Sequence, residues 1–247
     1  MPNIKLVIEY DGTGYGGWQK QKNAVTVQET LEDALQRITG EKNTVIGAGR
    51  TDSGVHALGQ VANFHTQSSI PPERFAYALN AVLPPDIRIK ASEQVPEDFH
   101  ARYSATGKKY RYSIHNHVHG TAIDRNTSYH VREKLSVKEM EEAASFLIGT
   151  HDFKSFCAAG SSVKTTVRTV QQAFFQQEGS RIDFYIEGNG FLYNMVRIIA
   201  GTLIEVGKGK RKPGEMSGII EARDRRMAGP TAPAKALCLL EVMYENS

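Results

Sequence analysis

The alternation of hydrophobic and polar positions in residues 1–105 predicts four strands and two helices. The expected strands, rich in β-branched and apolar residues, span residues 3–10, 44–48, 60–65 and 87–95. One expected helix runs from 26 to 38, because a capping box, Thr26-Val-Gln-Glu29, opens an apolar stripe of Val27, Leu31, Ala34, Leu35 and Ile38. The second helix begins at Pro71 and Pro72 and continues through Phe75, Ala78 and Leu79. The resulting order, β-α-β-β-α-β, is that of a ferredoxin-like unit.

Residues 106–247 repeat most of this order. Strands are expected at 108–114, 165–177, 181–187 and 237–244, and helices from the capping box at Ser136 to about Gly149, at 191–206 and at 213–227. Two similar halves, 1–105 and 106–247, indicate a duplicated fold of the α+β class. We expect their sheets to join into one large, mostly antiparallel sheet with helices on one face, which leaves a central cleft on the open face.

Composition supports an ordinary globular protein. The chain has 247 residues, of which 40% are hydrophobic and 23% are charged, and its formal net charge is +3. These values argue against disordered, fibrous and membrane classes. The charge is unevenly spread, because the first 105 residues carry 10 basic and 12 acidic side chains and the remainder carries 20 and 15. Any electrostatic attraction to a nucleic acid is therefore expected mainly from the second half.

The sequence favours a cytoplasmic location. Cys157 and Cys238 are the only cysteines, too few for a disulfide framework or a zinc ligand set. Lys5 and Glu9 interrupt the apolar N-terminal stretch, so no signal peptide is expected. The longest apolar stretch, 191–206, contains polar and charged residues and does not predict a membrane span.

The sharpest candidate for chemistry is the segment Gly47-Ala-Gly-Arg-Thr-Asp-Ser-Gly-Val-His56. Its glycines permit tight turns or the close approach of a ligand. Arg50 and Asp52, two residues apart, would lie on the same face of an extended chain. A carboxylate in such a loop could act as a nucleophile or a base. The alternative is a structural turn with an internal ion pair.

Four further features could carry function, and each also has a purely structural interpretation. Tyr110 lies in an interleaved basic and aromatic strand, which is suited to stacking on bases but equally to a buried tyrosine face. Arg197, in an apolar helix, needs an acidic partner such as Asp52 unless it reaches solvent. The alternating histidines could bind a metal, although loop histidines are the simpler interpretation; they are His115, His117 and His119. The basic loop 207–212 could touch phosphate or remain solvated.

Six blocks along the chain together resemble the tRNA pseudouridine synthase A (TruA) family. They occur in the family's order and span nearly the whole sequence: Tyr10-Asp-Gly-Thr-Gly-Tyr-Gly-Gly-Trp-Gln19, Gly49-Arg-Thr-Asp-Ser-Gly-Val-His-Ala57, Asp98-Phe-His-Ala-Arg102, Lys109-Tyr-Arg-Tyr112, His151-Asp-Phe-Lys-Ser-Phe156 and Met195-Val-Arg197. The resemblance implies the pseudouridine synthase fold. It also implies isomerisation of uridine to pseudouridine at positions 38, 39 and 40 of the tRNA anticodon arm, by a homodimer in which the tRNA contacts both subunits.

The resemblance further implies that the reaction uses no cofactor and no catalytic metal. It assigns the catalytic role to Asp52 and base stacking to Tyr110. Arg50 matches an arginine that helps to displace the target nucleotide, and Arg197 matches one that pairs with the catalytic aspartate. The loop from Trp18 to Asn23 matches one that contacts RNA.

Two other functions fit parts of the pattern. A catalytically silent RNA-binding protein could use the same duplicated scaffold, because fold does not fix function. An enzyme that cleaves glycosidic bonds with two carboxyl groups is the other possibility, but no second acid is framed as well as Asp52. The joint presence of Asp52, Tyr110 and Arg197 favours the synthase.

Overall fold

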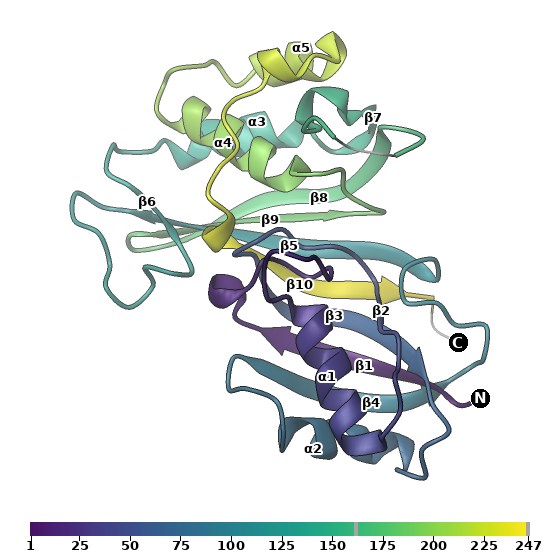
Figure 1. Ribbon diagram of the computed structural model, residues 1–247. Coiled ribbons are helices and arrows are strands. Elements are labelled where there is room, and N and C mark those ends of the chain that lie inside the picture. The colour runs from purple at the N-terminus through teal and green to yellow at the C-terminus, as the bar shows by residue number, and fades with distance from the viewer. Residues whose placement is uncertain (161–162, 246–247) are drawn as a thin grey trace. The chain divides into compact units, whose positions relative to one another are not determined.

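The computed structural model describes residues 1–160 and 163–245, which fold into two compact units (Figure 1). The first unit comprises Met1–Thr106 and the end of the chain from Cys238 onward, and the second comprises Gly107–Leu237. The expected α+β class is confirmed, because each unit combines helices with a mostly antiparallel sheet. In the described part of the chain, no helix is long and apolar enough to cross a membrane.

The first unit is built on a sheet with the strand order β4-β1-β3-β10, with β2 paired to β3. Its elements are β1 (Asn3–Tyr10), α1 (Val27–Thr39), β2 (Ile46–Gly47), β3 (His56–His65), α2 (Phe75–Asn80), β4 (Ile87–Val95) and β10 (Leu237–Tyr244). β1 is antiparallel to both β3 and β4. Up to β4 the order of helices and strands agrees with the expected ferredoxin-like order, and Figure 1 shows α1 drawn across the strands of this sheet.

The strand expected at residues 237–244 is present as β10. From Cys238 this strand belongs to the first unit, where it runs parallel to β3 with Cys238 opposite His56. A run of apolar residues predicts a strand but does not identify its partner, and here the partner is far away in the sequence.

Helix α1 follows directly from its sequence. The Thr26 side chain accepts a hydrogen bond from the Glu29 backbone, as the capping box predicts. The helix ends at Gly40, whose left-handed backbone (φ 75°) is a common helix stop. Its inward residues are buried; they are Val27, Leu31, Ala34 and Leu35. The buried stripe fixes α1 against the sheet, so the segments on either side of it are held at defined positions.

The second unit contains a sheet with the order β5-β9-β8-β7, with β6 parallel to β5. Its strands are β5 (Ala105–Asn116), β6 (Tyr129–Val131), β7 (Gly149–Asp152), β8 (Val167–Glu178) and β9 (Arg181–Gly188). Its helices are α3 (Val137–Ser145), α4 (Met195–Gly207) and α5 (Glu215–Ala222). β8 and β9 form the expected hairpin, with Gly179 at positive φ in the turn. The short strands β6 and β7 were not predicted, because three or four residues give too little alternation to detect.

The three helices of the second unit are shorter than their patterns predict. α4 begins only after Asn194, whose left-handed backbone (φ 60°) interrupts the apolar run. α5 ends at Ala222, because Arg223 is also left-handed (φ 51°). α3 ends at Ser145, and its N-cap residue, Ser136, makes no side-chain capping bond. Side-chain periodicity therefore located the helices, whereas the left-handed residues Asn194 and Arg223 set the start of α4 and the end of α5.

Candidate active site

Asp52 lies on the loop that connects β2 to β3 in the first unit, and its side chain is half-buried. The loop is bonded to β3 at its start, where the Ala48 N–H donates to the Val61 carbonyl at 2.7 Å. The Gln60 side chain then donates to the Gly49 carbonyl at 2.9 Å. At Gly54 the backbone turns through positive φ (79°), which favours glycine and brings the chain back into β3. Asp52 thus occupies a tight, fixed turn, as its flanking glycines predict.

The residue before Asp52 is held by two residues of the Tyr10–Gln19 block, one through its side chain and one through its backbone. The hydroxyl groups of Tyr10 and Thr51 lie 2.7 Å apart, and the backbone N–H of Trp18 donates to the Thr51 carbonyl at 3.0 Å. Tyr10 and Trp18 are both buried. Burial raises the pKa of Tyr10 well above its usual range, so its hydroxyl stays protonated and available for this bond.

The same block also contacts the loop beyond Asp52. The Tyr15 carbonyl accepts hydrogen bonds from the Ser53 hydroxyl at 3.1 Å and from the Gly54 N–H at 3.4 Å. Gly17 has positive φ (96°), and a Cβ atom there would stand 2.5 Å from the Thr51 carbonyl oxygen. Two of the blocks that carry the family resemblance are therefore one structural unit. Sequence reasoning missed this role of the first block, because hydrogen bonds between distant residues leave no local pattern.

Arg50 is exposed on the same loop, two residues before Asp52. The sequence predicted that the two side chains would share a face of an extended chain. The structure places both on the connection between β2 and β3, outside either strand. Arg50 is therefore accessible to a polyanion, whereas Asp52 is partly enclosed by the loop that carries it.

Tyr110 lies on β5 in the second unit and is 8% exposed. Its ring meets that of Phe191 edge-on, with centroids 5.2 Å apart. Two residues along, Tyr112 is fully buried and its hydroxyl donates to the Pro233 carbonyl at 3.0 Å. The buried tyrosine face that the sequence allowed is present. Because Phe191 supports the ring of Tyr110, the ring has a fixed orientation, which suits a stacking surface.

Arg197 lies in the first turn of α4 and is half-buried. Its Nε donates to the Ala232 carbonyl at 2.8 Å, and its Nη1 donates to the Asn194 side-chain oxygen at 2.8 Å. The left-handed conformation of Asn194 places that oxygen beside the helix start. Two bonds within the second unit therefore fix the direction of the guanidinium.

Two other candidates have structural partners. His115 and His130 bond through Nε2 to the carbonyls of His119 and His117, and no group of three or more metal-ligating side chains gathers anywhere in residues 1–160 and 163–245. His115 lies on β5, whereas His117 and His119 lie in the loop that follows it. In the basic loop, Lys208 pairs with Glu133 at 2.9 Å and Arg211 with Glu205 at 2.6 Å. Half of this loop's cations thus contribute to local structure.

A family model described as tRNA pseudouridine synthase matches residues 6–104 and 143–245. The matched stretches contain the Asp52 loop, the segment that holds it, and the first turn of α4 with Arg197. The chain belongs to this family of enzymes, which isomerise uridine to pseudouridine in tRNA.

Individual relatives narrow the family to the one that the six blocks resemble, tRNA pseudouridine synthase A. The chain is 58% identical over 244 residues to "tRNA pseudouridine synthase A" of Acetivibrio thermocellus, covering 99% of this chain and 100% of the relative. The protein of the same name from Ruminiclostridium cellulolyticum is 56% identical over 245 residues, with the same coverage. The one from Clostridium acetobutylicum is 53% identical over 244 residues, again covering 99% and 100%. The resemblance to the TruA family is thereby confirmed along the whole chain.

Proposed function

We propose that this enzyme isomerises the uridines at positions 38, 39 and 40 of the tRNA anticodon arm, with Asp52 as its catalytic residue. The observation that carries the proposal is the fixation of the Asp52 loop by Tyr10 and Trp18, both of which bond to the adjacent Thr51. A carboxylate on a loop held from both sides is pre-organised, and pre-organisation of the reacting group is a large part of catalysis. The choice of positions rests on the resemblance of the six sequence blocks to the TruA family.

The reaction needs a single well-placed carboxylate. The N1–C1′ bond of uridine breaks, the base rotates, and a C5–C1′ bond forms; the C5 proton leaves and N1 gains a proton. Nothing is consumed, so the proposal assigns the reaction no cofactor and no metal. Asp52 acts on the ribose, either by attack at C1′ or by removal of a sugar proton. The base must first leave the stack, because the reacting atoms are inaccessible inside a helix.

Three further residues support these steps. Tyr110 stacks on the detached base, a role suited to a ring that Phe191 holds in place. Arg50, exposed on the same loop as Asp52, helps to displace the target nucleotide. Arg197 supports the catalytic carboxylate, and its bonds to Ala232 and Asn194 define the direction of its guanidinium.

The proposal includes a cytoplasmic homodimer with one tRNA in contact with both subunits. A net charge of +3 per chain gives about +6 per dimer, concentrated in the more basic second half. When lysine and arginine side chains bind the phosphate backbone, counterions are released from the tRNA. The affinity for tRNA should therefore fall as the salt concentration is raised. Shape and base extrusion then provide selectivity.

Release of tritium from tRNA labelled at uridine C5 tests the reaction directly, without added metal or nucleotide. Wild-type enzyme should release tritium to water. Asp52→Asn, a nearly isosteric change, should abolish release while tRNA binding persists. Asp33→Asn is the matched control, because Asp33 is an exposed aspartate on α1 of the same unit and should be dispensable. Retained turnover in Asp52→Asn would remove Asp52 from the mechanism.

Two measurements test the finer parts of the proposal. Three transcripts each keep uridine at one of positions 38, 39 and 40 and carry cytidine at the other two, and each should release tritium. A transcript with cytidine at all three positions should release none. Release from that last transcript would refute the assignment of positions. Sedimentation of the enzyme at several concentrations tests the dimer. The dimer is refuted if the sedimenting particle contains only one 27.3 kDa chain even in the presence of tRNA.

A further inference from the structure

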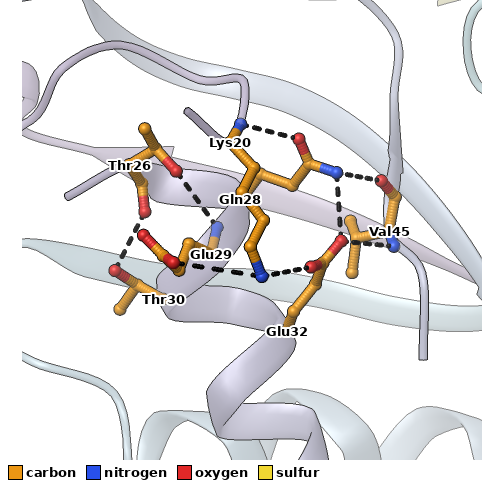
Figure 2. Close-up of polar contacts among 7 residues, drawn as sticks. All are labelled: Lys20, Thr26, Gln28, Glu29, Thr30, Glu32 and Val45. Atoms are coloured by element: carbon orange, nitrogen blue, oxygen red, sulfur yellow. Dashed lines mark hydrogen bonds and ion pairs between the residues drawn. The ribbon is translucent and has the colours of Figure 1, made fainter. Parts of the chain in front are cut away.

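Gln28, near the start of α1, bonds to both the loop from Trp18 to Asn23 and Val45, which directly precedes β2 and the Asp52 loop (Figure 2). Its Oε1 accepts from the Lys20 N–H at 3.0 Å, and its Nε2 donates to the Val45 carbonyl at 3.1 Å. The two backbone partners fix the orientation of the amide, because reversing it would set N–H against N–H and oxygen against oxygen. One side chain therefore joins two segments that are distant in the sequence.

Glu32, one turn further along α1, completes the connection. Its Oε1 accepts from the Val45 N–H at 3.2 Å and from Gln28 Nε2 at 3.0 Å. Its Oε2 lies 3.5 Å from the Lys20 ammonium, which also lies 3.9 Å from Glu29. Both backbone groups of Val45 are thus bonded by side chains of α1, and Figure 2 shows these bonds between the helix and the segment that precedes β2. We name Lys20, Gln28, Glu32 and Val45 the Gln28 network.

The Gln28 network bonds to the segment that leads through β2 into the Asp52 loop. On its other side, that chain is bonded to β3, with Ile46 opposite Asn63 and Gly47 opposite Ala62. A Cβ atom on Gly47 would overlap the indole of Trp18, so the indole lies directly against this strand. The backbone of Gln28 also donates to the Trp18 carbonyl at 3.0 Å. Displacement of Val45 would therefore pass along a short strand to the turn that carries Asp52.

The other end of the network faces open solvent. The loop borders a hollow of about 580 Å³ that Lys20 and Lys22 help to line. The Lys20 side chain is 51% exposed, whereas that of Glu32 is 16% exposed. An RNA phosphate can approach Lys20 from the hollow, but it cannot replace the enclosed bonds that Glu32 makes to Val45.

We propose that Gln28 and Glu32 are positioning residues for the isomerisation: they hold the loop that contacts RNA and the loop that carries Asp52 in one fixed relation. The inference rests on the proposed function, because it takes Asp52 as the catalytic residue. Neither side chain touches the reacting atoms; both act through the backbone of Val45. Their loss should therefore lower the rate of the bound complex more than it lowers tRNA affinity.

Steady-state kinetics with C5-tritiated tRNA test this. For Gln28→Ala we expect kcat to fall about ten-fold, because small misplacements of reacting groups reduce rate strongly, while KM stays within about two-fold of wild type. Gln36→Ala is the matched control, because Gln36 is an exposed glutamine two turns further along the same helix. An unchanged kcat in Gln28→Ala, an equal fall in Gln36→Ala, or an effect on KM alone would overturn the proposal.

A pair of changes at Glu32 keeps the proposal testable if Gln28→Ala does not fold. Glu32→Gln retains an oxygen for Val45 and removes only the ion pair with Lys20, so it should keep most of kcat. Glu32→Ala removes both the oxygen that bonds to Val45 and the ion pair with Lys20. Its kcat should fall as much as that of Gln28→Ala. Equal kcat in the two Glu32 variants would overturn the positioning role.

Asp52→Asn, assayed alongside, separates the two proposals. If it retains turnover, the assignment of Asp52 fails. If it is inactive while the Gln28 and Glu32 variants behave as wild type, only the positioning inference fails.

Discussion

The Tyr10 hydroxyl lies 2.7 Å from the Thr51 hydroxyl, which places the last residue of β1 in direct contact with the residue before Asp52. Tyr10 is 2% exposed, and its ring lies beside that of Trp18 with centroids 6.2 Å apart. The loop is thus tied to the rigid centre of the first unit. Two separate blocks of the sequence, 10–19 and 49–57, are therefore in direct contact in the structure.

Tyr10→Phe should lower both stability and rate. The change leaves the buried Thr51 hydroxyl without this partner, which should reduce the free energy of unfolding by about 1–2 kcal/mol. It should also lower kcat, because one of the contacts that fix the Asp52 loop is lost. Urea unfolding and tritium release measure the two effects. Tyr77→Phe removes a hydroxyl from a tyrosine that is 71% exposed in the same unit, and it should change neither. If both variants behave as wild type, the Tyr10 contact does not fix the loop.

Gly47→Ala should be poorly tolerated, because the new methyl group would overlap the Trp18 indole. Overpacking of this kind costs about 1–3 kcal/mol and should displace the start of the Asp52 loop. Gly218→Ala makes the same change in α5, where a Cβ atom meets nothing within 4 Å. It should raise stability by about 0.5–1 kcal/mol, because alanine restricts the unfolded chain and favours helix. Thermal unfolding of both variants decides the matter, and a stable Gly47→Ala would show that Trp18 can move aside.

Local patterns predicted the parts of this fold that depend on neighbouring residues. The Thr26 cap and the apolar stripe are both evident from Thr26 and the 13 residues of α1 that follow it. The structure contains the cap and buries the stripe. The glycine-flanked turn around Asp52 was likewise evident from a short segment. In each case the sequence signal lies within one short segment of the chain.

The contacts that hold the site could not be predicted in this way. The bond between Tyr10 and Thr51 joins residues 41 positions apart, and the parallel pairing of β10 with β3 joins segments at opposite ends of the sequence. The left-handed conformation of Asn194, which sets the start of α4, is a single-residue feature inside an apolar run. The family pattern singled out the blocks that contain Tyr10 and Thr51, but it did not indicate that the two residues touch.

Asp224 provides a prediction on pH. Hydrogen bonds from the Arg226 side chain lower the pKa of Asp224 to about 2. Its pKa in the unfolded chain is near the ordinary value, so the contribution of this pair to stability is present above about pH 4 and is lost as pH falls toward 2. Arg226→Gln should raise the pKa of Asp224 and reduce this loss. NMR titration of the carboxyl group checks the shift, with Lys138→Gln, an exposed cation on α3, as the control. An unchanged midpoint in Arg226→Gln would assign the shift to another cause.

Arg197→Lys tests whether a fixed guanidinium, rather than any cation, is required. Arginine bonds to Ala232 and Asn194 at once through two nitrogens, whereas lysine has a single ammonium that cannot occupy both positions. We expect kcat to fall about ten-fold to a hundred-fold through loss of alignment, with little change in KM for tRNA. Arg132→Lys, at an exposed arginine after β6, should leave kcat unchanged. If Arg197→Lys retains full kcat, a positive charge suffices at this place; if KM rises instead, Arg197 contributes to binding and does not support Asp52 during the chemical step.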